Sequence, residues 1–300
     1  MMSRRDFVRT TAVSVLAPPL GWVRSHRSAD QLNVGFLRGP GAAAENAVQS
    51  TSGFELGIGE ARHAAILFGK SIASPPVSSD PAKEARATIA TLAESGVQAI
   101  VFDGNASDAA AAAGESAQRG IVFVNATCTA DSLREAACSR FVYHVAPSDS
   151  MREAARSLVV SISSVSPAPL RIETWHPSLV RYGAVQLNDR FRPGSGERMG
   201  SVAWGAWMSV KILWEAFLRA NEPTSSGIVE YLSRESSQFD GHKGIALSFR
   251  SWDHQLRQPL YAISADETSA IEIPALSRPD VSTKDLLDMI GARRRASTCA

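Results

Sequence analysis

Short apolar runs alternate with segments of helical spacing from about residue 31 onward. The apolar runs lie at 32–37, 97–102, 121–124 and 141–145. The segments in which apolar residues recur at the spacing of a helix lie at 54–68, 81–95, 109–118 and 132–137. Short strands that alternate with helices predict an α/β fold, with a parallel sheet covered by helices on both faces.

Each of the first three apolar runs ends in a loop of glycine and small polar residues. These loops lie at 38–41, 103–105 and 125–129. The carboxyl ends of parallel strands meet at one edge of a sheet, and ligands of open α/β sheets bind beyond that edge. We therefore expect the three loops to lie together and to form the candidate binding site.

The second half of the chain predicts further helices and two short strands. The helices are expected at 150–162, 182–191, 201–220 and 228–234, the strands at 247–249 and 259–263, and a Ser/Pro-rich linker at 163–169. In the longest helix Trp204, Trp207 and Trp214 share one face. The simpler interpretation is a helix that packs its aromatic face into a core, and a ligand platform is the alternative.

The amino-terminal segment carries the features of a twin-arginine export signal. Arg4 and Arg5 are followed by Phe7 and by a weakly apolar run over 10–23. The alternative is a frayed basic terminus that happens to contain two arginines. Removal of residues 1–29 as a signal would leave 26 basic and 29 acidic side chains, a formal net charge of −3 instead of +1. The signal interpretation predicts a periplasmic protein that folds before export.

The composition, with 44% hydrophobic and 20% charged residues, is that of an ordinary globular protein. No uninterrupted apolar stretch in the sequence reaches the roughly 20 residues of a membrane span. The only basic cluster is the arginine run at 293–295, which we interpret as part of a short solvated tail. Binding to nucleic acid is therefore not expected.

The cysteines do not form a redox or zinc motif, because no C-x-x-C pair occurs. In an exported protein Cys128 and Cys138 could pair in a disulfide that closes a short loop. Two buried free thiols are an equally weighted alternative. Cys299 is expected as a free thiol in the tail.

Motifs for catalysis or for a cofactor are not found in the sequence. The glycines at 57 and 59 resemble a dinucleotide fingerprint, but they fall inside a predicted helix and not at a turn after a strand. No G-x-S-x-G elbow occurs, and the histidines are scattered. The pair Asp253-His254 is better explained as two polar residues on the surface than as half of a catalytic pair. No catalytic residue, cofactor or metal is therefore expected, and the chain is not expected to be an enzyme.

The order of loops and helices resembles the leucine/isoleucine/valine-type (type I) periplasmic binding proteins, over most of residues 32–265. The resemblance implies a two-lobed fold in which two loops of the first lobe hold the polar end of a ligand. Backbone N–H groups and hydroxyls at helix N-termini suit a carboxylate or another acceptor-rich group. The positions that match the two loops are Asn105, Ala106 and Ser107, and Thr127, Cys128 and Thr129.

Several runs in the second half are similar to one branch of that family. Its members are binding proteins encoded with pyrroloquinoline-quinone-dependent alcohol oxidation systems. The matching runs lie at 175–179, 182–184, 186–191, 239–244 and 252–261. The resemblance adds Trp175 as a further candidate ligand contact.

The chain departs from the family pattern in the second lobe. Between the helix at 150–162 and Trp175 only about a dozen residues remain, where the family has several strand–helix units. We therefore expect a reduced second lobe, which puts hinge closure over a ligand in doubt. The expected organisation is a signal at 1–29, lobe one at 30–148, lobe two at 149–265 and a carboxyl-terminal extension at 266–300.

The resemblance implies a solute-binding protein that delivers a small polar molecule to the permease of an ABC transporter, with a metabolite of alcohol oxidation as ligand. A second hypothesis is an accessory or scaffold partner of a periplasmic quinoprotein dehydrogenase that binds no ligand. A third hypothesis is a periplasmic enzyme, for which the sequence offers no catalytic constellation.

Overall fold

A five-stranded parallel sheet forms the centre of the molecule, with the strand order β2-β1-β3-β4-β5. Its strands are β1 (Gln31–Arg38), β2 (Ser71–Ala73), β3 (Ala99–Asp103), β4 (Val122–Asn125) and β5 (Val142–His144). Four of them match the apolar runs of the sequence to within two residues at either end. The prediction of a parallel sheet is confirmed for this part of the chain.

The computed structural model describes residues 30–76, 84–135, 138–162, 170–268, 270–274, 282–290 and 299. The predicted export signal at 1–29, the linker at 163–169, the helix start at Pro81 and the arginine run at 293–295 lie outside these residues. None of the described helices is long and apolar enough to cross a membrane.

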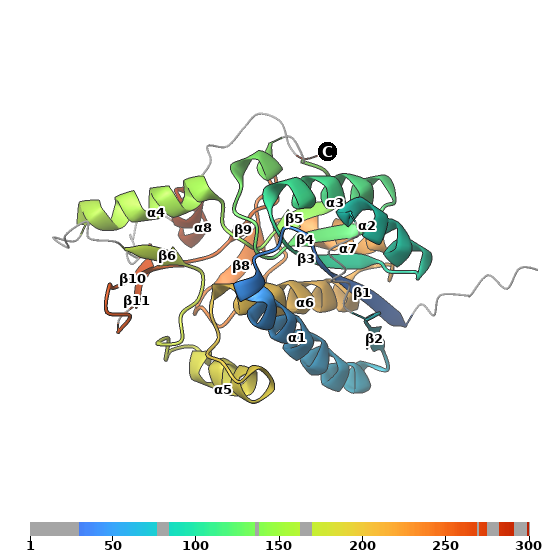
Figure 1. The fold of residues 1–300 in the computed structure, drawn as a ribbon, viewed down its shortest axis with the longest axis horizontal. Helices are drawn as coiled ribbons and strands as arrows, with labels where there is room; N and C mark the ends of the chain where they lie inside the picture. The colour runs from blue at the N-terminus through green and yellow to red at the C-terminus, as the bar shows by residue number, and fades with distance from the viewer. Residues whose placement is uncertain are drawn as a thin grey trace, which may run out of the picture.

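Both faces of the parallel sheet are buried, because successive strand residues point to opposite sides. Val34 and Phe36 belong to the large apolar core on one face, whereas Leu37 packs among apolar residues on the opposite face. The helices that surround the sheet in Figure 1 are α1 (Ala47–Phe68), α6 (Ser201–Arg219) and α7 (Ser225–Ser233) on the first side, and α2 (Ala85–Glu94) and α3 (Ala106–Gln118) on the second.

Helices α1 and α6 pack closely because α1 presents glycines to its partner. A Cβ atom on Gly53 would lie 2.2 Å from the carbonyl oxygen of Ala203, and one on Gly57 would lie 2.8 Å from Cβ of Val210. The glycines at 57 and 59 lie inside α1, as predicted. The tryptophans of α6 are buried, with 0–5% of their surface exposed, so the prediction of a core helix is confirmed.

A second, smaller core lies beside the parallel sheet, at the left of Figure 1. It contains a three-stranded antiparallel sheet in the order β11-β10-β6. The elements are β6 (Arg171–Glu173), β10 (Leu260–Ile263) and β11 (Ala270–Ile273), with α4 (Asp149–Ile162) against them. The described strands of this core are therefore antiparallel, unlike those of the central sheet.

The remaining elements belong to neither of these two sheets. They are η1 (Ala44–Asn46), η2 (Asp131–Arg134), α5 (Ala184–Ser195), β7 (Phe239–Asp240), β8 (Ala246–Phe249), β9 (Leu256–Arg257) and α8 (Thr283–Asp288). Strands β7, β8 and β9 form an antiparallel sheet, and a parallel bridge between His144 and Gln255 joins its end to β5. Asp288 of α8 accepts from the buried Arg250 and Arg257 at 3.1 and 2.7 Å, which fixes this helix to the β8–β9 turn.

The predicted second lobe at 149–265 is divided between the two cores. Helices α5, α6 and α7 contribute buried residues to the same core as β1. Only α4, β6 and β10 of that range line the second core. The domain boundary between residues 148 and 149 stays a prediction. The core around β1 contains residues from both sides of this boundary.

The disulfide between Cys128 and Cys138, which the sequence leaves open beside two buried free thiols, does not form. Cys138 pairs with Cys299, and Cys128 is free and buried. Cys128 cannot turn toward Cys138, because its side chain is packed in the core under α3. The expectation of a free thiol at Cys299 is wrong, because Cys299 is the partner of Cys138.

Candidate functional site

The loops after β1, β3 and β4 meet at the carboxyl edge of the parallel sheet, as the sequence predicts. The amide of Gly39 donates to the carbonyl of Asp103 at 2.8 Å, and the amide of Gly41 donates to Oδ2 of Asp108 at 2.7 Å. The amide of Gly104 donates to Oγ1 of Thr127 at 3.2 Å. These three bonds tie each loop to the next one along the edge.

The Asp103 carboxylate is the hub of this edge. It accepts from Nε of Arg38 at 2.9 Å, from Oγ of Ser50 at 2.7 Å and from Oγ1 of Thr127 at 2.8 Å. The side chain of Asp103 is only 2% exposed, so these bonds replace the water that it loses on folding. A buried carboxylate thus holds the loops of three strands against the start of α1.

The first predicted loop opens helix α3. The side chain of Asn105 accepts from the amide of Asp108 at 2.8 Å and caps the helix. Asn105, Ala106 and Ser107 are exposed. The first amides of a helix have no acceptor inside it, and together with the helix dipole they favour an anion or another acceptor-rich group. This loop therefore offers free N–H groups and the Ser107 hydroxyl at the edge.

The second predicted loop is held by the side chain of Asn125, at the end of β4. Asn125 accepts from the amide of Cys128 at 2.9 Å and donates to the carbonyl of Cys128 at 2.7 Å. Burial raises the pKa of the Cys128 thiol, so this side chain is neutral and belongs to the core. Thr127 and Thr129 are half-buried, and the Thr127 hydroxyl is already bound to Asp103. Of this loop, the Thr129 hydroxyl is the group best placed for a ligand.

Arg134 supports the second loop from below, a role that the sequence reading missed. Its guanidinium group donates to the carbonyls of Ala130 at 2.9 Å and Ala146 at 2.6 Å, and to Oε1 of Gln255 at 2.9 Å. Burial lowers the pKa of Arg134 to about 10, which leaves it charged at neutral pH. The only signal in the sequence is an arginine within a short helix, which does not reveal burial.

His144 lies under the same loop and is fully buried. Its Nδ1 atom is 3.3 Å from Nδ2 of Asn125. Burial lowers the pKa of His144 well below its usual value, and the nearby charges of Arg134 and His254 lower it further. His144 is therefore neutral, and Nδ1 accepts the hydrogen bond from the asparagine.

Trp175 is buried in the large apolar core. Its side chain is 1% exposed, its Nε1 atom donates to Oδ1 of Asn188 at 2.9 Å, and its ring stacks on Trp204 at 6.2 Å between centroids. The next residue of α6, Gly205, is so close to the second loop that a Cβ atom there would lie 2.5 Å from the carbonyl oxygen of Ala126. Trp175 is thus a core residue in this structure and does not offer its ring to a ligand, contrary to the prediction.

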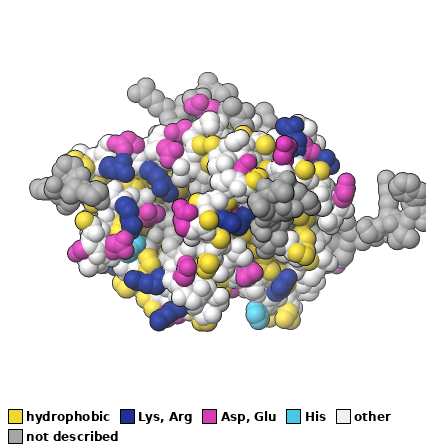
Figure 2. Space-filling view, viewed as in Figure 1, with side chains coloured by type: hydrophobic (Ala, Val, Ile, Leu, Met, Phe, Trp, Pro, Cys, Tyr) yellow, Lys and Arg dark blue, Asp and Glu magenta, His cyan; other side chains and the backbone are white. Residues whose placement is uncertain are grey.

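Charged side chains of both signs are interspersed over the face shown in Figure 2. Within the described parts of the chain no group of three or more His, Cys, Asp or Glu side chains could hold a metal ion. What the carboxyl edge offers is a set of hydrogen-bond donors: helix amides and two hydroxyls on rigidly held loops. Such a set can bind a polar group reversibly.

Solved structures with the same fold are solute-binding proteins of ABC transporters. The branched-chain amino acid transporter substrate binding protein LivJ from Streptococcus pneumoniae, in complex with isoleucine, superposes with a TM-score of 0.63 at 15% identity. The match covers 80% of this chain and 97% of that chain. An ABC transporter substrate-binding protein from Desulfitobacterium hafniense in complex with leucine matches with a TM-score of 0.65 at 14% identity, over 80% of this chain and 99% of that chain.

A solute binding protein of an ABC transporter from R. palustris, in complex with benzoate, matches with a TM-score of 0.64 at 12% identity. This match covers 81% of this chain and 95% of that chain. No family model matches the sequence. No curated protein matches it either. At these identities the comparison establishes the fold alone: an α/β fold with a parallel sheet flanked by helices, as in type I periplasmic binding proteins.

Proposed function

We propose that this chain is a solute-binding protein of an ABC transporter, which binds a small polar molecule reversibly and carries out no covalent chemistry. The observation that carries the proposal is the carboxyl edge, where the exposed start of α3 and the loop after β4 present donors side by side. The structures with this fold that hold isoleucine, leucine or benzoate all contain a ligand with a carboxylate, which supports the same kind of ligand here.

The proposed contacts follow from which donors are free. A carboxylate at this edge would accept from the amides at the start of α3 and from the hydroxyls of Ser107 and Thr129. The negative charge of Asp103 does not oppose this, because Arg38 pairs with it at 2.9 Å. Asn105 serves as the cap that keeps the helix amides in place.

The proposed setting is the periplasm, with residues 1–29 as a twin-arginine-type signal and a transporter permease as the partner. The similarity of the second half to proteins encoded with pyrroloquinoline-quinone-dependent alcohol oxidation supports a metabolite of that process as the ligand. These finer points rest on the sequence resemblance.

Thermal unfolding of the purified chain tests the proposal. The panel contains small carboxylates, amino acids, alcohols, aldehydes and pyrroloquinoline quinone. A ligand at about a hundred times its Kd adds about 2.7 kcal/mol of stability, a rise of roughly 5–10 °C in Tm for a chain of this size. We expect one class of carboxylate to raise Tm in this way. The absence of any saturable ligand would refute the proposal.

Point variants test whether the ligand binds at the carboxyl edge. Ser107→Ala and Thr129→Val each remove one hydroxyl at the edge, and the loss of a hydrogen bond to a charged group should weaken binding about tenfold. Ser226→Ala is the matched control, because Ser226 is exposed on α7. Equal affinity in all three variants would show that the ligand does not bind at this edge.

A second candidate function is an accessory protein of a periplasmic dehydrogenase that binds no ligand. The observation that favours it is the small size of the second core, which has three antiparallel strands in the described part of the chain. The burial of Trp175 also removes a predicted ligand contact. Stable co-purification with such a dehydrogenase, together with a Tm that no compound shifts, would support this function over the first.

A further inference from the structure

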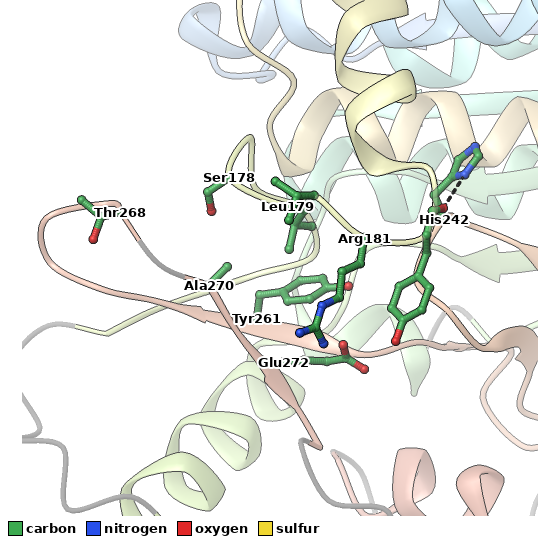
Figure 3. A pocket seen from close by; sticks show the side chains of 10 residues that line it. Ser178, Leu179, Arg181, His242, Tyr261, Thr268, Ala270 and Glu272 are labelled. Atoms are coloured by element: carbon green, nitrogen blue, oxygen red, sulfur yellow. Dashed lines mark hydrogen bonds between the residues drawn. The ribbon is translucent and has the colours of Figure 1, made fainter.

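A pocket distinct from the carboxyl edge lies between the second sheet and the segment before α5. Its volume is about 360 Å³, which is in the range of sites for small molecules. Figure 3 shows its walls. They are formed by the segment from Ser178 to Tyr182, by His242, by Tyr261 of β10, and by Thr268, Ala270 and Glu272 of the β10–β11 hairpin.

One wall is a polar row on a single face of the second sheet. Tyr261 lies directly opposite Glu272 on β11 and opposite Glu173 on β6, so the three side chains share one face. Glu173 is satisfied, because its carboxylate accepts from Oγ of Ser201 at 2.6 Å. Glu272 differs: it is half-buried and has no hydrogen bond or ion pair to any residue that the structure describes.

Two basic side chains face the Glu272 carboxylate, and burial lowers the pKa of one of them, Lys243, well below its usual value. Burial raises the pKa of Glu272, and the charges of Lys243 and Arg181 oppose this rise. Lys243 is already engaged, since its Nζ atom donates to Oε1 of Gln258 at 2.8 Å and to the carbonyl of Pro259 at 3.0 Å. The ammonium group of Lys243 also lies 4.0 Å over the ring of Trp204 and has no exposed surface. It therefore cannot move to Glu272.

Arg181 lies at the rim of the pocket and is exposed. Its guanidinium group also has no hydrogen bond or ion pair to a described residue. In Figure 3 this group and the Glu272 carboxylate point into the same space beside the ring of Tyr261. The pocket thus presents one negative and one positive group side by side next to an aromatic ring (Figure 3), neither of them paired with a described residue.

The rim that carries Arg181 is held in place by the turn after β7. Nδ1 of His242 donates to the carbonyl of Tyr182 at 3.0 Å, as the dashed line in Figure 3 shows. The ring of Tyr182 covers Gly244, where a Cβ atom would lie 2.4 Å from it. At the other end of the segment Ser178 donates its amide to His176 at 3.3 Å. A preformed rim lowers the entropy that a ligand must overcome on binding.

We propose that this pocket binds a small zwitterion, with its ammonium group against Glu272 and its carboxylate against Arg181. A ligand with one charge would pair with one of these two groups and lie beside a like charge on the other. A zwitterion satisfies both, and the Tyr261 ring adds a cation–π contact for the ammonium group. This site is separate from the carboxyl edge, so it extends the function proposed above and does not depend on it.

Isothermal titration of the full chain with three zwitterions tests the proposal. Glycine, β-alanine and γ-aminobutyrate have increasing distance between their charges, and n-butylamine and butyrate carry one charge each. We expect at least one zwitterion to bind saturably and both singly charged probes to bind about tenfold or more weakly, because each lacks one charge-assisted contact.

Glu272→Gln and Arg181→Gln should each weaken that zwitterion about tenfold or more. Glu94→Gln and Arg62→Gln are the matched controls, because Glu94 is exposed on α2 and Arg62 is exposed on α1, outside the pocket. An unchanged thermal melt shows that the pocket variants fold. The proposal is overturned if no zwitterion binds, if a singly charged probe binds as tightly, or if the pocket variants bind like the controls. Binding that Ser107→Ala weakens and Glu272→Gln does not would also overturn it, and would support the carboxyl edge instead.

Discussion

Replacement of Asp103 tests whether one carboxylate holds the carboxyl edge together. Asp103→Ala removes the acceptor for Arg38, Ser50 and Thr127 at once. The loss of one partner of a buried ion pair costs about 3–5 kcal/mol, since the other charge stays buried without compensation. The side chain of Arg38 is 14% exposed and can recover some hydration. We therefore expect a loss toward the lower end of this range, about 3 kcal/mol.

Asp103→Asn removes the negative charge of this side chain and keeps its shape, so it measures what the charge contributes to stability. The asparagine oxygen can still accept from Arg38 and Ser50, and its NH₂ group can donate to the Thr127 hydroxyl, which lies 2.8 Å from the carboxylate. Only the charge assistance is lost, which corresponds to a smaller destabilisation of about 1–2 kcal/mol. Asp189→Ala is the control, because Asp189 is exposed on α5.

Urea unfolding at neutral pH measures the free energy of unfolding of the wild type and of the three variants. An unchanged slope of this free energy against urea concentration shows that the same transition is compared. The expected order of stability is wild type, then Asp103→Asn, then Asp103→Ala. An alanine variant that is as stable as Asp189→Ala, to within about 0.5 kcal/mol, would refute the hub. The loops would then be held by their backbone bonds alone.

Three further predictions concern the packing, the disulfide and the buried imidazole. Gly205→Ala should lower stability by about 1–3 kcal/mol in thermal melts, because the methyl group meets a carbonyl oxygen at 2.5 Å, whereas Gly114→Ala has open space and should gain up to about 1 kcal/mol. Cys299→Ser opens the bond to Cys138, whose sequence separation is 161 residues, and should cost about 2–5 kcal/mol in urea, a loss that dithiothreitol reproduces in the wild type only. The lowered pKa of His144 means that the unfolded chain binds the proton more readily, so stability is complete above the unfolded pKa of about 6.5 and falls below it by up to about 1.4 kcal/mol per pH unit. Urea unfolding between about pH 7.5 and about pH 5.5 should show this fall, and His144→Gln should reduce it; an equal fall in the variant would contradict the assignment.

The sequence predicts the first sheet and the loops at its carboxyl edge well, because those features are local. Apolar runs that end in polar loops report strands buried on both faces, and the carboxyl ends of parallel strands must share an edge. The helix start at Asn105 is a local feature as well, since an asparagine before a run of alanines is a capping signal. The loops at 103–105 and 125–129 therefore lie where the periodicity places them.

The features that the sequence does not reveal depend on contacts between distant parts of the chain. Cys138 pairs with Cys299, which lies 161 residues away in the sequence, so the short spacing between Cys128 and Cys138 does not indicate the partner. Trp175 stands in a polar-looking segment, but α6 buries it. Arg181 and Glu272 come together only when β10, β11 and the segment before α5 assemble. Burial and partner choice at these positions are set by the tertiary fold.

The route of the chain between the two cores means that neither core is built from one continuous segment. The chain leaves the parallel sheet after β5, forms α4 and β6, returns with α5, α6 and α7 to complete the core around β1, and enters the second core again with β10 and β11. Segments from before and after this excursion thus depend on each other, and residues 30–148 alone would expose the sheet face that α6 covers. The second core likewise needs β6 from the first crossing and β10 and β11 from the later one. A cut of the chain between α7 and β10 would therefore separate β6 from the strand it pairs with.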